Sequence, residues 1–491
     1  MRETGDWIIP HLDRAIYAEK PPLFFWLINL STFFSGENTE LSNRFPSALA
    51  GLVTVFITFI FGGKLFNSRV GFLSGLILAT SMFFPLISRW VMLDSLLTLF
   101  FLLTLYYFYR GFDEDERRQR YYLLAGLFMG FGVLTKGPVA YLPIPIFLIF
   151  SFFQRNLKKF WCFDLLWGCL FSVMVVLIWW IPACWCGGRD YIHWILFKQA
   201  AGTLVEGGKH FHPESFIFYF IRFPIEFFPW IFFLPTAFIF GFRKKKDRSK
   251  EFLFLSIWFI FIFLFFTLSI GKKDNYLLPL YPAAAMMVGV LWDCGLRSLE
   301  GTKGFIAGLL LLALLFLIGF VLLLSGIAEK LYPALMDYHS LGLSLLFYLM
   351  VGSFLSLLFF MRKKGWASFI TLVIAFAVFQ LHLSYSLPPE LNSQRSMKAF
   401  SERILKRMDV GDEIKTYWFK SNGLFYYTRK PYIEEIDTTD RFVEVLRSSH
   451  RVFIVILAEM FDKLKRDAGI EIDPIDQAKV GHWNYILISN H

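Results

Sequence analysis

An acidic and a basic residue stand directly before a proline pair and an apolar run near the start of the sequence. Glu19 and Lys20 precede Pro21-Pro22 and the apolar residues 23–34. This run is too short to span a bilayer and predicts an interfacial helix with Pro near its first turn. Backbone N–H groups at a helix N-terminus favour an anion, so Glu19 and Lys20 flank a candidate anion site. A plain interfacial anchor with a solvated ion pair is the alternative.

A second candidate is Asp94, which lies early in the apolar run 91–109. A carboxylate at that depth in a membrane is costly unless it faces a polar cavity or a partner. We therefore interpret Asp94 as functional. The alternative is a structural ion pair with the neighbouring Arg89.

Three lysines lie between apolar runs on what should be the outer face: Lys136, Lys272 and Lys273. Outer loops are normally poor in positive charge, so these ammonium groups indicate an anionic partner such as a phosphate. Snorkelling to lipid headgroups is the alternative. His210 and His212, near the end of the longest outer loop, are a weak metal signal that Glu19 or Asp94 would have to complete.

The elements that must position these residues follow from composition. Of 491 residues, 56% are hydrophobic and 18% are charged, with 61 Phe. An ordinary soluble protein has about 45–50% apolar and about 25% charged residues, so this is a polytopic membrane protein. Cytoplasmic loops of such proteins collect Lys and Arg, so the net charge of +10 predicts no nucleic-acid partner. The five cysteines indicate neither a metal site nor a disulfide framework.

Apolar runs bounded by charge, Pro or Gly predict about twelve transmembrane helices. The predicted spans are 44–63, 70–88, 91–109, 121–135, 137–153, 163–182, 221–240, 251–269, 276–296, 304–326, 341–361 and 367–387. The spans 121–135 and 137–153 are short and joined by Lys136-Gly137-Pro138, so one broken helix is the alternative reading of this pair.

The distribution of Lys and Arg among the loops sets the expected orientation. If the spans alternate, one set of loops carries most of the basic residues and is cytoplasmic. Residues 1–43, the loop 183–220 and the C-terminal tail then lie outside. We expect an extracytoplasmic juxtamembrane segment 1–43, a transmembrane domain 44–387 and an extracytoplasmic soluble domain 388–491. No apolar segment precedes residues 1–43 to start their export. A missing first helix explains this at least as well as the alternative, a short tail that crosses the membrane unaided.

The tail predicts a small α/β domain. Strand-like runs alternate with helical patterns in it. The expected strands are 413–419, 424–428, 451–457 and 485–489, and the expected helices are 394–408, 440–448 and 459–467. The tail carries no phosphate-cradling glycine loop, zinc spacing or nucleophile elbow, so no organic cofactor is expected. Internal repeats are not apparent either, which weakens a transporter built on duplicated halves.

Several motifs, in order along the first 290 residues or so, together resemble the aminoarabinose transferase and protein O-mannosyltransferase family. They are Gly5-Asp6-Trp7, Glu19-Lys20-Pro21-Pro22-Leu23, Arg44-Phe45-Pro46-Ser47-Ala48-Leu49, Met92-Leu93-Asp94, Leu134-Thr135-Lys136-Gly137-Pro138, Ser269-Ile270-Gly271-Lys272 and Tyr276-Leu277-Leu278-Pro279. The resemblance implies a GT-C fold. It also implies transfer of a sugar, with inversion, from a polyprenyl phosphate to an extracytoplasmic acceptor. In bacteria the donor lipid would be undecaprenyl phosphate in the plasma (inner) membrane, and the acceptor a lipid A-like phosphate, a protein or another glycan.

The resemblance also implies roles for individual residues. Lys20 and Lys272 would hold the donor phosphate, with Lys136 and Lys273 as further phosphate ligands from the charge argument. Glu19 and His210 would lie at a site for a divalent metal or other polar group, with Glu19 a catalytic acid as well. Asp94 would be catalytic and line the acceptor cavity. A hydroxyl acceptor needs a carboxylate base, whereas a phosphate acceptor needs none.

Two departures from the family pattern keep alternatives open. Family members begin with a spanning helix and an acidic motif, whereas this sequence begins just after that point, which favours a mis-assigned start or a fragment over an inactive, truncated relative. Relatives of the aminoarabinose branch often carry Arg-Phe upstream of the loop histidine, where this sequence has Thr203-Leu204, so the sugar and the acceptor stay open. A flippase for lipid-linked sugars is the competing function, disfavoured because the candidate residues gather at one membrane face.

Overall fold

The computed structural model describes residues 1, 5–12, 15–17, 19–160, 162–193, 214–243, 250–298, 302–430, 432–468 and 472–490. They form two compact units. The first unit comprises Met1–His11 and Ile16–Gln380, and the second comprises Leu12–Ala15 and Leu381–His491. Near the start of the chain lie the two-residue strands β1 (His11–Leu12) and β2 (Ala15–Ile16).

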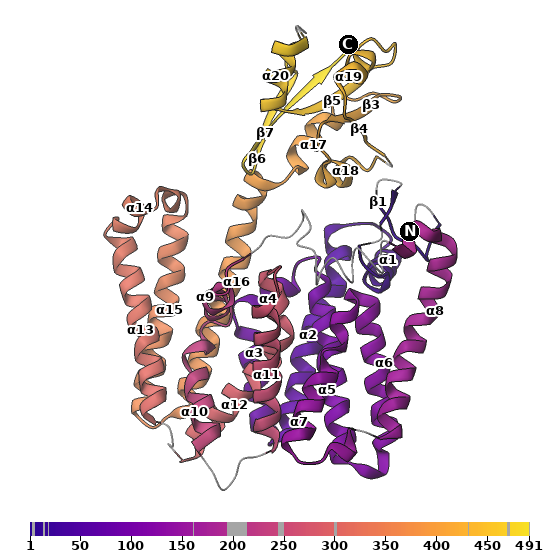
Figure 1. The fold of residues 1–491 in the computed structure, drawn as a ribbon. Helices are drawn as coiled ribbons and strands as arrows, with labels where there is room; N and C mark the ends of the chain where they lie inside the picture. Colours follow the sequence, from indigo (N-terminus) through magenta and orange to yellow (C-terminus); the bar gives the residue numbers. More distant parts are fainter. Residues whose placement is uncertain are drawn as a thin grey trace. The chain divides into compact units, whose positions relative to one another are not determined.

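The first unit is a helical bundle (Figure 1). Its α-helices are α1 (Leu23–Ser35), α2 (Glu40–Leu65), α3 (Ser68–Thr80), α4 (Phe83–Ser88), α5 (Leu93–Asp113), α6 (Arg118–Lys136), α7 (Pro143–Phe153), α8 (Phe163–His193), α9 (Phe218–Glu226), α10 (Leu234–Arg243), α11 (Lys250–Leu268), α12 (Tyr281–Ser298), α13 (Thr302–Leu324), α14 (Ile327–Leu331), α15 (His339–Met361) and α16 (Gly365–Arg395), of which α16 continues into the second unit. Short 3₁₀ turns join them: η1 (Asp115–Arg117), η2 (Pro138–Tyr141), η3 (Leu157–Lys159), η5 (Trp230–Phe232), η6 (Asp274–Leu280) and η7 (Pro333–Tyr338). The predicted interfacial helix corresponds to α1, which begins directly after Pro22.

Among the described residues, eight helices are long and apolar enough to cross a membrane, and the bent pair α9 and α10 makes up to nine. The eight lie in α2, α5, α8, α11, α12, α13, α15 and α16. The other three of the twelve predicted spans, 70–88, 121–135 and 137–153, contain helices that are shorter or less apolar. Two of these helices pack between neighbours in the bundle, α3 between α2 and α12 and α6 between α5 and α8. A helix that contacts protein on two sides needs fewer apolar residues than one surrounded by lipid.

The chain reverses direction between α6 and α7. Gly137 ends α6 with φ of 90°, a conformation that favours glycine. The ring of Phe147 in α7 then lies 6.0 Å from that of Tyr122, near the other end of α6. The two segments are therefore separate antiparallel helices and not one broken helix.

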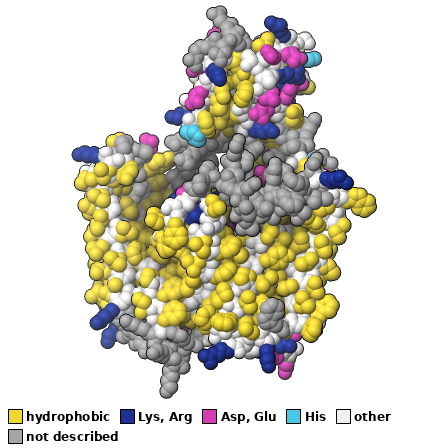
Figure 2. All heavy atoms as spheres, in the orientation of Figure 1, with side chains coloured by type: hydrophobic (Ala, Val, Ile, Leu, Met, Phe, Trp, Pro, Cys, Tyr) yellow, Lys and Arg dark blue, Asp and Glu magenta, His cyan; other side chains and the backbone are white. Residues whose placement is uncertain are grey.

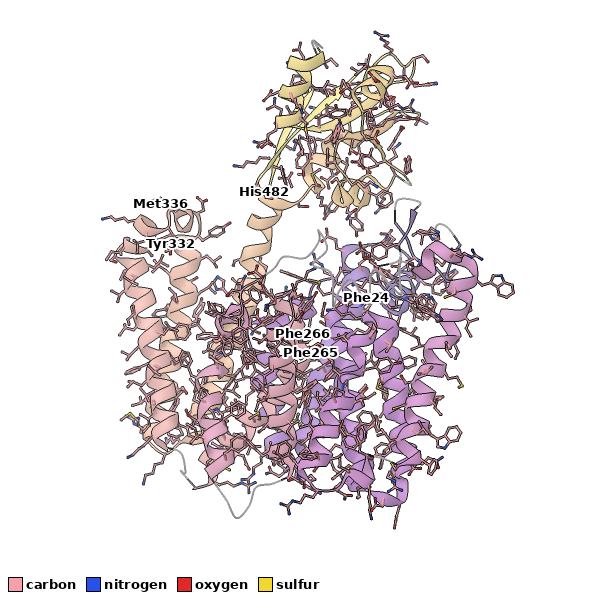
Figure 3. All side chains as sticks on the ribbon, viewed as in Figure 1. Phe24, Phe265, Phe266, Tyr332, Met336 and His482 are labelled. Carbon is pink, nitrogen blue, oxygen red and sulfur yellow. The ribbon has the colours of Figure 1, made fainter. Side chains whose placement is uncertain are left out.

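Hydrophobic side chains cover the outside of the bundle over much of its height, and Lys and Arg gather below this band (Figure 2). The tip of the α13–α15 hairpin is also apolar and exposed, with Tyr332 and Met336 on its surface (Figure 3). Such a surface is incompatible with water over that area, so the first unit is a multi-pass membrane domain.

The second unit is a small α/β fold. Its elements after α16 are α17 (Lys398–Leu405), β3 (Glu413–Tyr417), α18 (Asn422–Thr428), β4 (Glu434–Ile436), α19 (Thr439–Leu446), β5 (Val452–Leu457), α20 (Ala458–Ala468), β6 (Asp476–Val480) and β7 (Trp483–Ser489). The five strands form a sheet of order β4-β3-β5-β7-β6. Strands β4, β3 and β5 are parallel, and β7 runs antiparallel to both β5 and β6. The continuous apolar run of β5 is buried on both faces, as expected of a central strand.

One expected strand of the tail is wrong. Residues 424–428 form most of helix α18, although Phe and Tyr favour strands. The helix forms because Ser421 caps it, its Oγ accepting a hydrogen bond from the Leu424 N–H at 3.1 Å. Strands β4 and β6 were not expected from the sequence, because both are short and neither contains a run of apolar residues.

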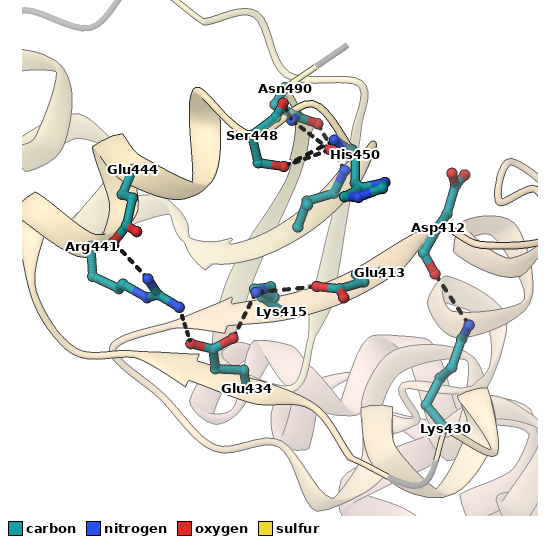
Figure 4. A network of polar contacts seen from close by, with 11 residues as sticks. Asp412, Glu413, Lys415, Lys430, Glu434, Arg441, Glu444, Ser448, His450 and Asn490 are labelled. Atoms are coloured by element: carbon teal, nitrogen blue, oxygen red, sulfur yellow. Dashed lines mark hydrogen bonds and ion pairs between the residues drawn. The ribbon is translucent and has the colours of Figure 1, made fainter.

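A network of ion pairs joins the parallel strands β3 and β4 at one edge of this sheet (Figure 4). Lys415 of β3 is 9% exposed, and its Nζ lies 2.6 Å from Glu434 Oε2 in the neighbouring strand β4 and 3.2 Å from Glu413 Oε2. Arg441 of α19 reaches Glu434 as well, at 3.5 Å. A buried lysine is tolerated here because two carboxylates neutralise it.

Candidate functional site

Asp94 is the centre of a polar cluster at one end of the bundle. It lies in the first turn of α5, where the backbone N–H groups favour a carboxylate, and it is 3% exposed. Its Oδ1 pairs with the ammonium group of Lys136, the last residue of α6. Its Oδ2 accepts a hydrogen bond from Asn275 Nδ2 of η6 at 2.7 Å. Three segments far apart in the sequence therefore meet at one carboxylate.

The start of α5 is itself held in place. The Ser47 hydroxyl of α2 donates a hydrogen bond to the Met92 carbonyl at 2.9 Å, and Ser47 Oγ accepts one from the Met92 N–H at 3.1 Å. Ser47 is fully buried. This contact fixes the first turn of α5 and thereby the position of Asp94.

Lys20 lies in the same electrostatic environment. It is half-buried and forms no ion pair with any residue that the structure describes. Burial lowers the pKa of Lys20, and the ammonium group of Lys136 lowers it further, against the opposing effect of Glu19 and Asp94. A half-buried ammonium group beside a second one is a place where an anion is stabilised.

Lys272 and Lys273 occupy different environments. Lys272 is 7% exposed, and its Nζ donates to the carbonyl oxygens of Ser269 at 2.7 Å and Glu214 at 3.1 Å. Lys273 is exposed, and its charge is among those that act on Lys20. Among the described residues the Lys273 ammonium group has no hydrogen-bond or ion-pair partner and can meet a ligand, whereas that of Lys272 already joins two loops.

Helix α9 fixes the segment that carries these lysines. The Tyr219 hydroxyl donates to the Lys273 carbonyl at 3.0 Å and accepts from the Lys273 N–H at 3.2 Å. One turn further, Arg222 pairs with Asp274 at 3.2 Å. These contacts hold the stretch between α11 and η6 against α9.

A buried acid, one turn further along α9, makes another contact of this kind. Glu226 of α9 is 5% exposed and accepts a hydrogen bond from the Tyr281 hydroxyl of α12 at 3.0 Å. Its second oxygen, Oε1, is buried and has no hydrogen-bond partner among the residues that the structure describes. Helix α9 thus contacts the segment 273–281 through one face, since positions 219, 222 and 226 follow helical spacing.

The expected metal site is only partly within the described residues. Glu19 is exposed, and its Oε2 accepts a hydrogen bond from the Tyr17 hydroxyl at 3.2 Å. His210 and His212 lie outside the part of the chain that the structure describes. Among the residues it does describe, no group of three His, Cys, Asp or Glu side chains is placed to hold a metal ion. A metal held by Glu19 and His210 therefore stays a prediction.

The structure thus brings Lys136 and Asp94 into contact, and the charges of Lys136, Asp94 and Lys273 act on Lys20. Sequence reasoning assigned no role to Asn275 or Tyr276, although the Lys136 Nζ lies 4.5 Å from the centre of the Tyr276 ring. It also missed the three α9 residues. Glu226 had a signal, since an acid within an apolar run needs a partner, whereas Tyr219 had none.

Comparison with known proteins gives a consistent picture. Residues 19–179 match the model of the family described as dolichyl-phosphate-mannose-protein mannosyltransferase. The undecaprenyl phosphate-alpha-4-amino-4-deoxy-L-arabinose arabinosyl transferase of Pectobacterium atrosepticum is 30% identical over 302 residues, which are 60% of this chain and 53% of that protein. The transferase of the same name from Photorhabdus laumondii is 26% identical over 64% of this chain and 58% of its own length. The chain thus spans about half the length of the curated relatives it matches.

A solved structure extends the likeness to the whole chain. The crystal structure of ArnT from Cupriavidus metallidurans bound to undecaprenyl phosphate superposes with a TM-score of 0.82 and 17% sequence identity, covering all of this chain and 91% of that one. At this identity the likeness concerns the fold, and it confirms the GT-C membrane fold with a small C-terminal α/β domain. The motif resemblance drawn from the sequence is confirmed as well.

Proposed function

We propose that this chain, whose residues 19–179 belong to the dolichyl-phosphate-mannose-protein mannosyltransferase family, is an integral membrane glycosyltransferase with a sugar-bearing polyprenyl phosphate as donor. The observation that carries the proposal is the nearly buried ion pair of Lys136 with Asp94, with the half-buried Lys20 near enough for both charges to act on it. Relatives named as acting on undecaprenyl phosphate-linked aminoarabinose support that donor class.

In the proposed reaction the acceptor oxygen attacks the anomeric carbon from the face opposite the phosphate. The bond between that carbon and the phosphate oxygen breaks, and the configuration inverts. Negative charge then grows on the departing polyprenyl phosphate. Ammonium groups fixed beside the phosphate stabilise this charge without having to reorganise. Because they stabilise the transition state more than the bound donor, they lower the barrier. Lys20 and Lys273 supply ammonium groups that pair with no residue in the described part of the chain, and Lys136 supplies one that Asp94 holds in place.

Asp94 acts in this scheme as a positioning residue. Both of its oxygens are engaged, one by Lys136 and one by Asn275. It would have to release a partner before serving as a base for a hydroxyl acceptor. A lipid A-like phosphate needs no base, so the engaged state of Asp94 favours an anionic acceptor over a protein or glycan hydroxyl.

Orientation in the membrane belongs to the same proposal. Asp94 lies in the first turn of α5, whereas Arg110 lies in its last turn, shortly before the basic stretch 117–120 in the sequence. Basic loops favour the cytoplasmic side, so we infer that the Arg110 end of α5 is cytoplasmic. The donor site and the C-terminal α/β unit are then extracytoplasmic, at the bacterial inner membrane. A divalent metal held by Glu19 and His210 would add charge neutralisation beside the phosphate, and the steps above do not depend on it.

The test is transfer of labelled sugar from a set of polyprenyl-phosphate donors to a lipid A acceptor by the purified chain in liposomes. We expect transfer by the wild type and by Lys364→Ala, an exposed lysine remote from the site, and none by Lys20→Ala. Movement of the labelled donor between leaflets without any transfer would contradict the proposal and favour a flippase. Activity of Lys20→Ala equal to wild type would remove this lysine from the donor site.

A further inference from the structure

A groove opens on the side of the bundle between α6 and α8, away from the residues discussed so far. Its lining consists of Gln119, Arg120, Leu123, Leu124 and Leu127 of α6 and Phe171 of α8. The two helices run parallel, since Gly126 lies beside Gly168 and Gly130 beside Val175. They pack closely, because a side chain on Gly126 would overlap the backbone of Gly168. The walls of the groove are apolar and its polar residues are all at the end where α6 begins.

The charge at that end is unbalanced. Arg118 points to the protein, where its Nε lies 2.7 Å from Asp164 of α8. Arg120 is exposed and makes no ion pair with any residue in the described part of the chain. An apolar channel with one free guanidinium group at its mouth matches a molecule with a hydrocarbon tail and an anionic head.

The surroundings of the groove are those of a lipid-facing surface. On α8, Trp167 and Leu170 are exposed at 55% and 48%, beside Phe171. A Trp near the charged end of a membrane helix is typical of the headgroup level. An occupant of the groove would therefore enter from the bilayer with its head level with Arg120.

The groove is distinct from the proposed donor site. Arg120 and Lys136 lie near opposite ends of α6, and sixteen residues of helix separate them by about 24 Å. This separation approaches the roughly 30 Å thickness of the hydrocarbon core. A lipid with its phosphate at Arg120 thus belongs to the leaflet opposite the one that presents phosphate to Lys136.

We propose that the α6–α8 groove binds an anionic glycerophospholipid of that leaflet, with one acyl chain along Leu123, Leu124 and Leu127 and its phosphate on Arg120. A zwitterionic lipid fits less well because its ammonium group would lie beside the guanidinium group. The bound lipid would fill the seam between α6 and α8 and thereby brace the helix that ends in Lys136.

Native mass spectrometry of the purified full chain, titrated with phosphatidylglycerol or phosphatidylcholine, tests this. Arg120→Gln removes the charge, and Leu127→Trp fills the groove without changing charge. The matched controls are Arg362→Gln, an exposed arginine at a helix end elsewhere in the bundle, and Leu170→Trp, a lipid-facing residue beside the groove. Thermal unfolding in detergent confirms that each variant is folded.

We expect wild type to retain phosphatidylglycerol in preference to phosphatidylcholine. Arg120→Gln should weaken this retention about tenfold, the size of a lost hydrogen bond to a charged group. Leu127→Trp should also weaken it, because the indole ring occupies the space of the acyl chain. The two controls should match wild type. Equal retention by Arg120→Gln and wild type, or no preference for the anionic lipid, would overturn the assignment. A third outcome would also overturn it: polyprenyl phosphate displaces phosphatidylglycerol, and Leu127→Trp retains phosphatidylglycerol as well as wild type does. The preference for the anionic lipid would then arise at the donor site.

Discussion

The carboxylate of Asp94 pairs with the ammonium group of Lys136, although the two residues are 42 positions apart. Asp94 lies in the first turn of α5, and Lys136 is the last residue of α6. The pair is nearly buried, with side-chain exposures of 5% for Asp94 and 14% for Lys136. Breaking such a pair leaves an uncompensated charge in a medium of low dielectric constant. The pair therefore fixes the position of the Lys136 ammonium group. In the proposed function, Lys20 is the ammonium group that faces the donor.

Asp94→Asn is the most direct probe of this relationship. The amide keeps the shape of the carboxylate but does not neutralise Lys136, so the lysine loses its fixed position. We expect turnover to fall at least tenfold, which is about 1.4 kcal/mol, while the dissociation constant of the donor changes by less than about threefold. Single-turnover kinetics together with donor titration separate the two quantities.

Asp113→Asn is the matched control, since Asp113 lies at the other end of α5 and pairs with Lys250 on a partly exposed surface. A surface pair of this kind contributes about 0–1 kcal/mol, so activity should be unchanged. An equal loss of turnover in both variants would assign the effect to α5 as a whole and not to Lys136.

The lowered pKa of Lys20 predicts how donor binding depends on pH. Its ammonium group is charged below that pKa and loses its charge as pH rises through it, which occurs at lower pH than for an ordinary lysine because burial and Lys136 disfavour the charged form. Donor affinity should therefore fall on the alkaline side. Lys20→Arg keeps its charge over this range, so the fall should move to higher pH. Identical alkaline profiles for the two proteins would contradict this assignment.

Tyr219→Phe tests whether α9 positions the lysine segment. The change removes one hydroxyl that both donates to and accepts from the Lys273 backbone. Each net hydrogen bond contributes about 0.5–1.5 kcal/mol, so we expect donor affinity to weaken about fivefold to tenfold. Tyr106→Phe, which removes a hydroxyl bound to Arg110 near the far end of α5, should leave donor affinity at the wild-type value. Equilibrium binding of labelled donor measures both.

The second unit should lose stability in acid in a way that depends on Glu434. The hydrogen bond from Lys415 lowers the pKa of Glu434, against the opposing effect of burial. A carboxyl with a lowered folded-state pKa stabilises the fold above its ordinary pKa, and this stabilisation is lost as pH falls through the lowered value. Hydrogen exchange of β3 and β4 in the intact chain should speed up in that window. Glu434→Gln, which cannot titrate, should show a smaller change between neutral and acid pH, and an unchanged acid response would exclude this carboxyl as its source.

Much of the membrane domain follows from local pattern. Each of the twelve apolar runs contains a helix or a bent pair, because an apolar backbone in lipid must satisfy its hydrogen bonds within its own segment. Similarly, the apolar run 451–457 predicts the central strand β5. The prediction failed where a short polar contact decided the conformation, as at Ser421, whose cap turns 424–428 into a helix.

The sequence by itself determined that this is a multi-pass membrane protein, which motifs it shares with a glycosyltransferase family, and that Asp94 and several lysines need partners. It did so because the cost of burying charge in lipid is a property of each residue and its immediate neighbours. Only the tertiary structure decided the pairings: Asp94 with Lys136 and Asn275, Lys273 with Tyr219, and Glu226 with Tyr281. These pairings depend on which helix ends meet in space. Helix packing brings together segments that are far apart in the sequence, and their separation along the chain does not reveal which of them will pack.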